Sequence, residues 1–401
     1  MKSRADLNEI LDATYRWSRE REFKGYNKHD ALNSPVVRLF MGWTRWLRII
    51  AIQVVMRLPF NVRPLLLTKK TYNPKGLALF ISGLVDRYRA GGGDIQLERA
   101  IELEEILESQ RCRGDWSGYS WGYHYAWQDL NFYVENGVPN AVVTVFVCEA
   151  YLDLYEVTKD LKYFDIASQG ITFLTQDLPT LYRGEEELCL SYVPLQANKA
   201  RVMDVSILIA ALLERHGCLG RSDLNKDTAR KLVNYVVRRQ TEEGAWFYTD
   251  PPERSPIRHD NYHTGFILDA LNRYRSYAET AAFDSQFSKG LAFYREHLFN
   301  EDSSPRWMSD QSYPHDVHGA AQGLLSFSEQ FLSNRAFLDS LSSWLIVNLY
   351  SGNGRFYYQK LRWFTKRVTY MRWCNAWAFR ALARYDLSLY TAENNEKPTD
   401  C

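Results

Sequence analysis

The chain has 401 residues, 46% of them hydrophobic and 14% aromatic, with a formal net charge of +1. This composition is typical of a globular protein and excludes a disordered one. The near-neutral charge gives no support to nucleic-acid binding as the main task. No Pro/Gly/Ser-rich or strongly charged linker divides the chain, so one large domain is expected.

The six cysteines are scattered and show neither C-x-x-C nor Cys/His metal spacing. Reduced thiols in a cytoplasmic protein are the simplest account, and no metal or other cofactor is expected. The N-terminal sequence lacks the apolar segment of a secretory signal. We therefore expect a cytoplasmic protein, with the inner face of the membrane as the alternative location.

The most hydrophobic window, 35–60, contains four arginines, at positions 38, 45, 48 and 57. Charges at this density argue against a transmembrane span. The arginines and apolar residues separate imperfectly onto two faces, which predicts an amphipathic helix over 36–57. Packing on the rim of the fold is favoured, and contact with a membrane surface is the alternative.

Segments with helical periodicity alternate in two series along the chain. The inner series starts with unusual polar and aromatic residues and comprises 76–88, 140–157, 198–216, 262–276, 316–332 and 373–386. The outer series comprises 36–57, 94–109, 161–177, 226–240, 284–298 and 335–349. Polar residues at inner-helix starts (Asn140, Asn198, His263, His318 and Asn375) recur every 55–65 residues.

This period fits one helical hairpin with its loops. It predicts an all-α fold, an (α/α)6 toroid of six hairpins over 36–390. A helical extension over 1–35 precedes the toroid and a disordered tail over 391–401 follows it. Strand signals are sparse, and the short aromatic stretches near 246–248 and 356–358 are expected to be loop hairpins.

Two turns share the pattern Q-x3-G-x-W, at Gln110–Trp116 and Gln240–Trp246. Glycine permits the positive φ of a tight helix exit, the glutamine can bond the loop backbone, and the ring can cover the neighbouring hairpin. The same turn occurs in terpenoid cyclases, so it predicts toroid packing better than chemistry.

The segment before Asn140 alternates aromatic with small or polar residues, including His124. In an extended segment this spacing puts five rings on one face, those of Tyr119, Trp121, Tyr123, Tyr125 and Trp127. Rings with hydrogen-bonding edges suit sugars, so a glycan-binding platform is predicted. The alternative is a strand-like plug on the mouth of the toroid.

Two inner-helix starts, one repeat apart, carry an acid and imidazoles. They are His259–Phe266 and His315–Gln322, with the candidate catalytic residues Asp260, Tyr262, His263, Asp316 and His318. Acid/base chemistry is favoured over zinc ligation, because the spacing is not H-E-x-x-H. The alternative is that each aspartate only caps its helix. Gln322 shares a helix face with His318 and is a candidate binding residue.

A fourth start holds Tyr370, Arg372 and Trp373. Arg372 can hold a carboxylate or phosphate of a ligand, with a structural ion pair as the alternative. Asn140, Asn198 and Arg201 belong to the same set of positions. In a toroid these helix starts converge on one end of the central cavity, and all of them are candidate substrate-binding residues.

With these motifs, the chain resembles toroid proteins encoded in bacterial extracellular-polysaccharide gene clusters. The resemblance covers most of the chain and rests on Asn73–Leu77, Pro139–Thr144, Asp260–Gly265, His315–His318 and Tyr370–Trp377. The function of that group is unsettled, so the resemblance supplies context more than mechanism.

Tyr262-His263-Thr264 is also similar to a Tyr-His-Thr stretch of D-glucuronyl C5-epimerases, and on that analogy Tyr262 exchanges a proton at the uronate C5. The broader six-hairpin glycosidase class shares the architecture and uses acidic catalysts, for which Asp260 and Asp316 are the candidates. The resemblance alone does not choose between these chemistries.

The first functional hypothesis is a carbohydrate-active protein of polysaccharide biosynthesis. It acts on a uronate-containing oligosaccharide or polysaccharide precursor by acid/base chemistry, as an epimerase, a lyase or a glycoside hydrolase. The second is a non-catalytic glycan-binding or scaffold component of polysaccharide assembly. A terpenoid cyclase ranks last, because the helix starts are polar and no D-x-D-D motif is found.

Overall fold

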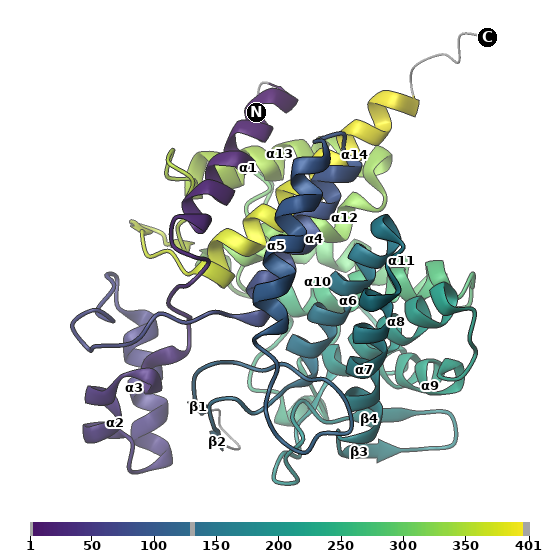
Figure 1. Ribbon diagram of the computed structural model, residues 1–401, viewed down its shortest axis with the longest axis horizontal. Helices are drawn as coiled ribbons and strands as arrows, with labels where there is room; N and C mark the ends of the chain where they lie inside the picture. The colour runs from purple at the N-terminus through teal and green to yellow at the C-terminus, as the bar shows by residue number, and fades with distance from the viewer. Residues whose placement is uncertain (1–2, 129–132, 396–401) are drawn as a thin grey trace.

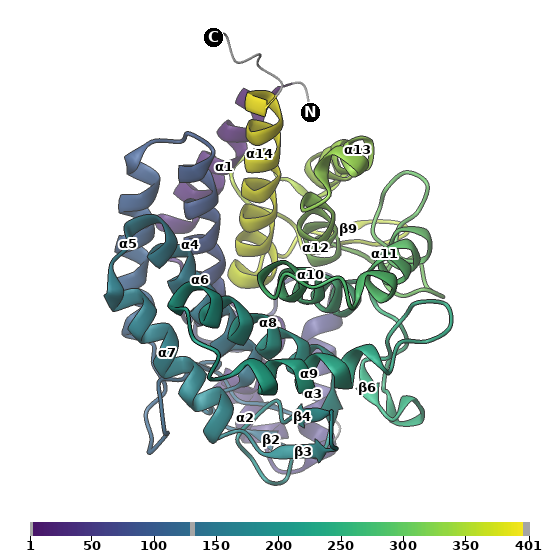
Figure 2. The same ribbon diagram turned by 90° about the vertical axis from the view of Figure 1, so that its right-hand side faces the viewer.

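The computed structural model of the protein describes residues 3–128 and 133–395. Six helices of this described part form an inner ring (Figure 2). They are α4 (Pro74–Arg89), α6 (Ala141–Thr158), α8 (Met203–Gly220), α10 (Asn261–Tyr277), α12 (Val317–Ser328) and α14 (Trp377–Asn395). Each packs against the next, and α14 packs against α4, so the ring is closed. Nearly all of α4 and most of α6 and α8 are buried, as expected of helices covered on all sides.

Five outer helices each follow an inner helix in the chain and pack against it. They are α5 (Asp94–Glu108), α7 (Leu161–Gln176), α9 (Lys226–Val237), α11 (Asp284–His297) and α13 (Phe331–Leu349). This arrangement confirms the predicted all-α toroid of helical hairpins.

The N-terminal helix α1 (Arg4–Arg19) completes the outer layer by packing against α14 (Figure 1). Its Leu7 and Leu11 are fully buried. Arg4 Nε donates to Asp386 Oδ1 at 2.6 Å, which joins the first turn of α1 to α14. The two ends of the described chain therefore close the toroid between them.

The prediction of one outer helix over 36–57 is wrong. The segment forms two helices, α2 (Pro35–Met41) and α3 (Arg45–Arg57), separated at Gly42 and lying outside the ring (Figure 1). They pack on the short turn η1 (Asp30–Asn33) around a small core of their own. We call residues 30–57 the N-terminal lobe. The helical periodicity of 36–57 indicates an apolar face, but it does not indicate which element of the fold packs against that face.

Short antiparallel strands lie in the loops beside the helices. They pair as β1 (Trp127–Gln128) with β2 (Tyr133–Val134), β3 (Thr180–Arg183) with β4 (Leu188–Leu190), β5 (Arg201–Val202) with β6 (Thr249–Asp250), and β7 (His315–Asp316) with β8 (Gln359–Lys360) and β9 (Thr365–Lys366). β5 leads directly into α8 and β7 into α12, so these pairs set where two inner helices begin. The predicted helix start at 198 is too early, because 198–202 form a loop and β5.

Both repeated turns place their glycine at positive φ, as predicted, but Gln110 donates to Ser109 Oγ at 2.7 Å rather than to the loop backbone. Gly114 and Gly244 have φ of +140° and +98°. Gln240 donates to the Gly244 carbonyl at 3.0 Å, and a side chain at Gly290 of α11 would meet the Trp246 ring. The ring therefore covers the neighbouring hairpin and helps to hold the two together.

Two further features bear on predictions made above. Among the described helices, none is both long enough and apolar enough to cross a membrane. Residues 391–395 of the predicted tail belong to α14, and residues 396–401 lie outside the described part of the chain.

Candidate functional site

The second residues of the inner helices gather at one end of the toroid. A short π-helical turn, η3 (Met371–Ala376), opens α14 and contributes the sixth member. The set is Lys75, Val142, Asp204, Tyr262, His318 and Arg372. Electrostatic interactions join Lys75 to Asp204, His318 and Arg372, so the positions face a common centre. Five of the six carry polar or aromatic groups, which makes this end the candidate site.

The imidazole of His318 lies within a cage of aromatic rings. It stacks on Tyr262 with 4.8 Å between ring centres and on Trp377 with 4.2 Å, while Trp373 meets it edge-on at 4.7 Å. The residue is buried, and neither ring nitrogen has a hydrogen-bond partner in the described part of the chain. Buried polar atoms almost always have a partner, so these nitrogens mark a place for a water or a ligand group.

A second imidazole flanks Tyr262, with 4.2 Å between the ring centres of Tyr262 and His263. Asp260 occupies the N-cap position of α10 but does not cap the helix with its side chain. Its two carboxylate oxygens instead lie 2.8 and 2.9 Å from His263 Nδ1. This contact fixes the orientation of the ring and places the proton on Nδ1.

The surroundings move the pKa values of the two imidazoles in opposite directions. Burial lowers the pKa of His318 well below 6.5, and the positive charges of Lys75 and Arg372 add to the effect. Burial also acts to lower the pKa of His263, but Asp260 outweighs it and raises that pKa above 6.5. At neutral pH His318 is therefore neutral, and His263 carries more of its proton than an ordinary histidine does.

Asp316 is fully engaged in local structure. One oxygen, Oδ1, accepts from the His318 backbone N–H at 2.9 Å and from Trp373 Nε1 at 2.8 Å. The other, Oδ2, accepts from Gln359 Nε2 at 2.8 Å. The carboxylate thus caps α12 and holds Trp373 against His318, which is the capping alternative raised from the sequence.

Three cations border the same centre. Lys28 Nζ lies 3.9 Å from the Trp373 ring, Lys75 Nζ lies 3.8 Å from a phenylalanine ring of α6, and Arg372 is buried. Burial lowers the pKa of Lys28 to about 8 and that of Lys75 well below 10.5. Within the described residues none of the three forms an ion pair, and Arg372 Nε has no hydrogen-bond partner. Cations that form no ion pair suit an anionic ligand.

Asp204 is the acid among the six second residues of the inner helices, and one of its carboxylate oxygens has no partner in the described part of the chain. That oxygen is Oδ1, which is buried. Burial raises its pKa above 3.8, against the opposing charges of His263 and Lys75. The residue faces the same centre as the two imidazoles.

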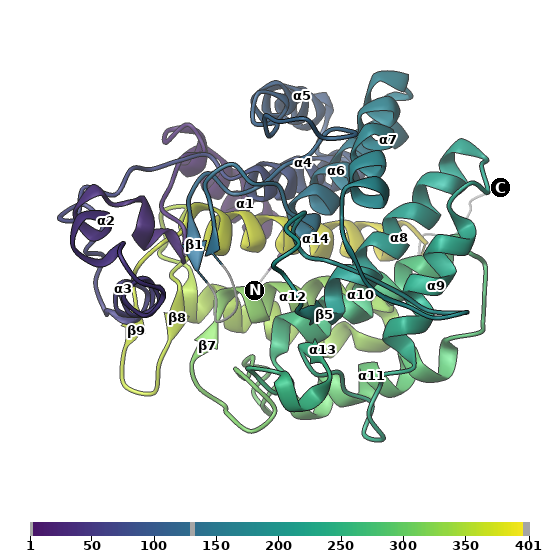
Figure 3. The ribbon, with the colours of Figure 1, turned by 90° about the horizontal axis from the view of Figure 1, so that it is seen from below.

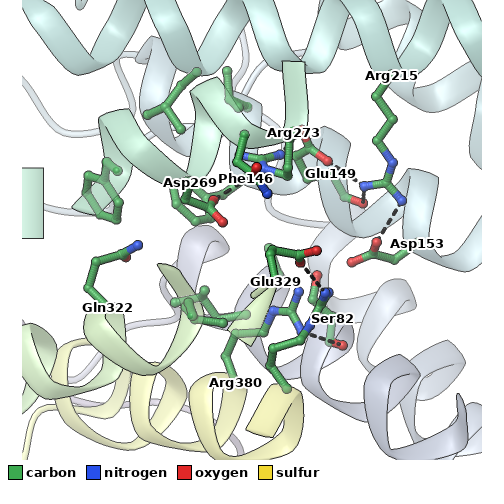
Figure 4. A pocket seen from close by; sticks show the side chains of 18 of the residues that line it. Ser82, Phe146, Glu149, Asp153, Arg215, Asp269, Arg273, Gln322, Glu329 and Arg380 are labelled. Carbon is green, nitrogen blue, oxygen red and sulfur yellow. Dashed lines mark hydrogen bonds and ion pairs between the residues drawn. The ribbon is translucent and has the colours of Figure 1, made fainter. Parts of the chain in front are cut away.

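The layers below this ring differ in character. One turn further along, the inner helices contribute Leu79, Phe146, Leu208, Phe266, Gln322 and Trp377, which line a cavity of about 250 Å³ together with charged side chains from further along the helices. Beyond them lies a network of charged side chains (Figure 4). There Arg215 pairs with Glu149 and with Asp153, the latter at 2.7 Å, and Arg273 also pairs with Glu149. The charges at that end satisfy one another, whereas the cations at the helix starts do not.

The predicted aromatic face over 119–127 does not form as a single surface. Trp121 is fully buried and donates from Nε1 to the Leu107 carbonyl. Tyr119 is exposed and packs on an arginine. Tyr123 stacks on Tyr125, with 5.1 Å between ring centres, and bends at 124–125 interrupt the extended backbone that the alternation required.

Of these rings, Tyr123 and Tyr125 reach the candidate site, and the Tyr125 hydroxyl interacts with the Arg372 side chain. Arg372 Cζ lies 5.4 Å from the centre of the Tyr123 ring. Trp127 belongs to β1 and meets Tyr192 edge-on at 6.0 Å. His124 is half-buried, burial lowers its pKa, and its Nε2 has no hydrogen-bond partner among the described residues.

Four other predicted binding residues serve local structure. Asn140 caps α6 through the Val143 N–H, and Asn198 donates to Ser191 Oγ. Arg201 pairs with a carboxylate across the β5–β6 ribbon at 3.2 Å, and Tyr370 Oη accepts from a buried arginine at 3.1 Å. Gln322 lies one layer below His318, and its Oε1 has no partner in the described chain.

Sequence reasoning missed Lys28, Lys75 and Asp204 as site residues. Lys28 lies in a segment expected outside the toroid, so no signal pointed to it. Lys75 did carry a signal. A lysine in the first turn of a helix is unfavourable next to the helix dipole, which indicates a role other than helix stability. Asp204 did not stand out, because an acid in a first turn is common.

The described residues contain no group of three or more His, Cys, Asp or Glu side chains placed to hold a metal ion.

No protein-family model matches the sequence, and no curated protein matches it significantly. Solved structures do share its fold. A cellobiose 2-epimerase from Bacillus thermoamylovorans is 10% identical, with a TM-score of 0.61, over 79% of this chain and 87% of that one. A polysaccharide lyase is 12% identical, with a TM-score of 0.59, over 99% of both chains.

A family 88 glycosyl hydrolase from Bacteroides vulgatus is 9% identical, with a TM-score of 0.58, over 97% of this chain and 99% of that one. Identities this low establish the fold and leave the activity to be argued from the site. The fold is the six-hairpin (α/α)6 toroid of glycosidase-like proteins. The predicted fold class is confirmed, as is the six-hairpin part of the resemblance.

Proposed function

We propose that the protein is a carbohydrate-processing enzyme that moves a proton at C5 of a uronate residue in a glycan. The observation that carries the proposal is the pair of imidazoles flanking Tyr262, whose pKa values are shifted in opposite directions. Such a divergence assigns a base and an acid within one site. Structural neighbours named as an epimerase and a lyase lend support at the level of the fold.

The chemistry follows from the protonation states. Neutral His318 accepts the C5 proton, and the electron pair left on carbon is delocalised into the adjacent carboxylate. Protonated His263 then delivers its proton to the opposite face of C5, which inverts that carbon. If the electron pair instead expels the oxygen on C4, the departing oxygen takes the proton from His263 and a C4–C5 double bond remains. The first outcome is epimerisation and the second is elimination.

The cations account for the negative charge. Removing the C5 proton places additional charge on the uronate carboxylate, and Lys28 and Arg372 lie where they can bind it. Preorganised positive groups in a buried site stabilise such charge strongly. Tyr262 stays neutral, because burial raises its pKa well above 10, so it is suited to donate a hydrogen bond rather than to act as the base.

A glycoside hydrolase is the second candidate, and Asp204 is the observation in its favour. Hydrolysis needs two carboxyl groups that face the scissile bond. Asp316 is bound by three donors and Asp260 by His263, so Asp204 lacks an evident partner acid. A biosynthetic role and a purely glycan-binding role remain proposals of lower rank.

The test is incubation of the protein in D₂O with oligosaccharides that contain glucuronate, galacturonate or mannuronate. Deuterium at C5, measured by mass spectrometry and NMR, is expected without cleavage from an epimerase. An unsaturated uronate is expected from a lyase. Saturated products with new reducing ends and no deuterium at C5 overturn the proposal in favour of hydrolysis. Binding without either reaction overturns it in favour of a scaffold.

A further inference from the structure

The N-terminal lobe exposes an apolar stripe that no other part of the described chain covers. Its members are Leu39, Phe40, Trp43, Trp46, Ile50 and Val54, which are 49–77% exposed. Trp46, Ile50 and Val54 are spaced four residues apart and share one face of α3. The opposite face of α3 packs on η1 and forms the core of the lobe. We call these six residues the α2–α3 face.

A second exposed apolar group lies beside the lobe although it is about 300 residues distant in sequence. Trp363 and Phe364, at the tip of the β8–β9 hairpin, are 84% and 49% exposed. Lys366 Nζ donates to the Met56 carbonyl in the last turn of α3, so the hairpin lies next to that helix (Figure 3). Of the chain's twelve tryptophans, the three exposed ones all lie on these two segments. Large exposed apolar groups that cluster mark an interaction surface.

The two chain segments that form this surface carry exposed charges of one sign. The sequence contains no acidic residue between Asp30 and Asp86, nor between Asp339 and Asp386. Exposed basic residues lie throughout both stretches, at Arg38, Arg45, Arg57, Lys69, Lys70, Arg362 and Arg367. Within the described residues none of them forms an ion pair. The surface is therefore complementary to a partner that offers an apolar layer to the exposed rings and negative charge to the basic residues.

We propose that the α2–α3 face and the β8–β9 tip bind the surface of a bilayer that contains anionic lipids. Tryptophan rings favour the headgroup level of a membrane, and arginines bind lipid phosphates there. α3 has 13 residues, too few to span the hydrocarbon core, so it lies in the plane of the interface with its exposed stripe inserted. A protein partner would have to combine a large apolar patch with dense negative charge.

The lobe also adjoins the candidate site. Arg48 Nε donates to Gln128 Oε1 at 3.0 Å, in the loop that leads to α6. Arg63, just beyond the lobe, donates to Tyr370 Oη at 3.1 Å, two residues before Arg372. Membrane binding holds this end of the toroid near the lipid surface, where a glycan attached to a lipid is within reach. That last step rests on the proposed function, whereas lipid binding itself does not.

The experiment is vesicle co-sedimentation of the full chain with phosphatidylcholine alone and with phosphatidylcholine mixed with phosphatidylglycerol. Binding is expected only to the anionic vesicles and is expected to weaken as salt rises. The double variant Trp43→Ser/Trp46→Ser is expected to lose at least about tenfold in affinity. Arg38→Gln and Arg45→Gln are expected to lose roughly fivefold each.

The matched control is Leu224→Ser/Leu332→Ser, which removes two strongly exposed apolar residues elsewhere and is expected to bind as wild type does. Circular dichroism and thermal melting confirm that each variant is folded.

Wild-type protein that remains in the supernatant with anionic vesicles overturns the proposal. So does sedimentation-equilibrium detection of a dimer that Trp43→Ser/Trp46→Ser dissolves, because the surface is then covered by a second copy. Loss of vesicle binding with C5 exchange retained on soluble glycans separates this proposal from the proposed function.

Discussion

At the scale of single residues, the candidate site depends on how two histidines with the same intrinsic pKa are made different. His263 is partly exposed and hydrogen-bonded to an acid, while His318 is enclosed by rings and faces cations. Burial acts on both in the same direction, so the acid beside His263 is what separates them. The assignment of roles therefore rests on Asp260.

We predict that Asp260→Asn lowers the pKa of His263. The carboxylate raises that pKa, so its removal leaves burial unopposed, and the proton is lost at lower pH than in the wild type. NMR titration of ¹³C-labelled histidine measures this, with the His263 signal assigned through His263→Gln. Asp160→Asn, which alters an exposed N-cap at α7, is the control and leaves the His263 titration unchanged. A His263 pKa that does not fall in Asp260→Asn contradicts the account.

Asp316 is predicted to act through structure. Asp316→Ala removes a helix cap and leaves the buried Trp373 Nε1 and Gln359 amide without an acceptor. We expect a loss of about 2–4 kcal/mol in the free energy of unfolding, measured in urea. Asp316→Asn retains a capping oxygen and is expected to lose clearly less. Equal losses in the two variants argue against the cap.

At the scale of elements, most helices could be read from periodicity. The predicted ranges for α5, α6, α7, α10 and α11 differ from the observed ones by at most one residue at either end, because a regular apolar stripe is a local property. Periodicity could not predict which outer helix packs against α14, the last inner helix. Both α1 and residues 36–57 carry an apolar face, and only tertiary packing decides that α1 covers α14.

The same limit applies to the site. His318, Tyr262 and Arg372 could be found because unusual residues at helix starts repeat along the chain. Lys28 could not, because it enters from a loop that owes its place to the docking of α1. The alternation over 119–127 indicated an extended strand, but buried Trp121 and the bends that follow it override that local preference.

The closing role of α1 can be tested by Leu11→Ala. Leu11 is fully buried against the toroid, so the smaller side chain leaves a cavity at the junction of the two chain ends. We expect a loss of about 2–5 kcal/mol in the free energy of unfolding by denaturant titration. Glu9→Ala, on the exposed face of the same helix, is expected to change it by less than about 0.5 kcal/mol. If Leu11→Ala leaves the free energy of unfolding unchanged, α1 is not part of the cooperative fold.

At the scale of the whole molecule, the two ends of the inner ring differ in how their charged side chains are paired. The far end is occupied by paired charges in which Arg215 meets three acids, Glu149, Asp153 and Glu156. The end at the helix starts keeps its cations unpaired within the described residues and stands beside the N-terminal lobe. The two ends therefore differ in charge pairing: the acids and arginines that line the cavity at the far end pair with one another, and in the described part of the chain the cations at the helix starts do not.

We predict that Arg215→Met destabilises the fold without changing ligand binding at the helix starts. The substitution leaves three partly or fully buried acids without their common partner, which typically costs about 3–5 kcal/mol. Urea unfolding measures the loss, and calorimetric binding of a uronate oligosaccharide below the unfolding range checks the site. Loss of binding in a folded Arg215→Met protein indicates that the far end takes part in recognition.

The most direct test of the central claim is the rate of deuterium incorporation at C5 of a uronate oligosaccharide in His318→Gln, compared with the wild type. We predict that His318→Gln still binds the oligosaccharide and exchanges about 10²–10⁴-fold more slowly, as expected when a general base is removed. A folded His318→Gln protein that exchanges at the wild-type rate contradicts this claim.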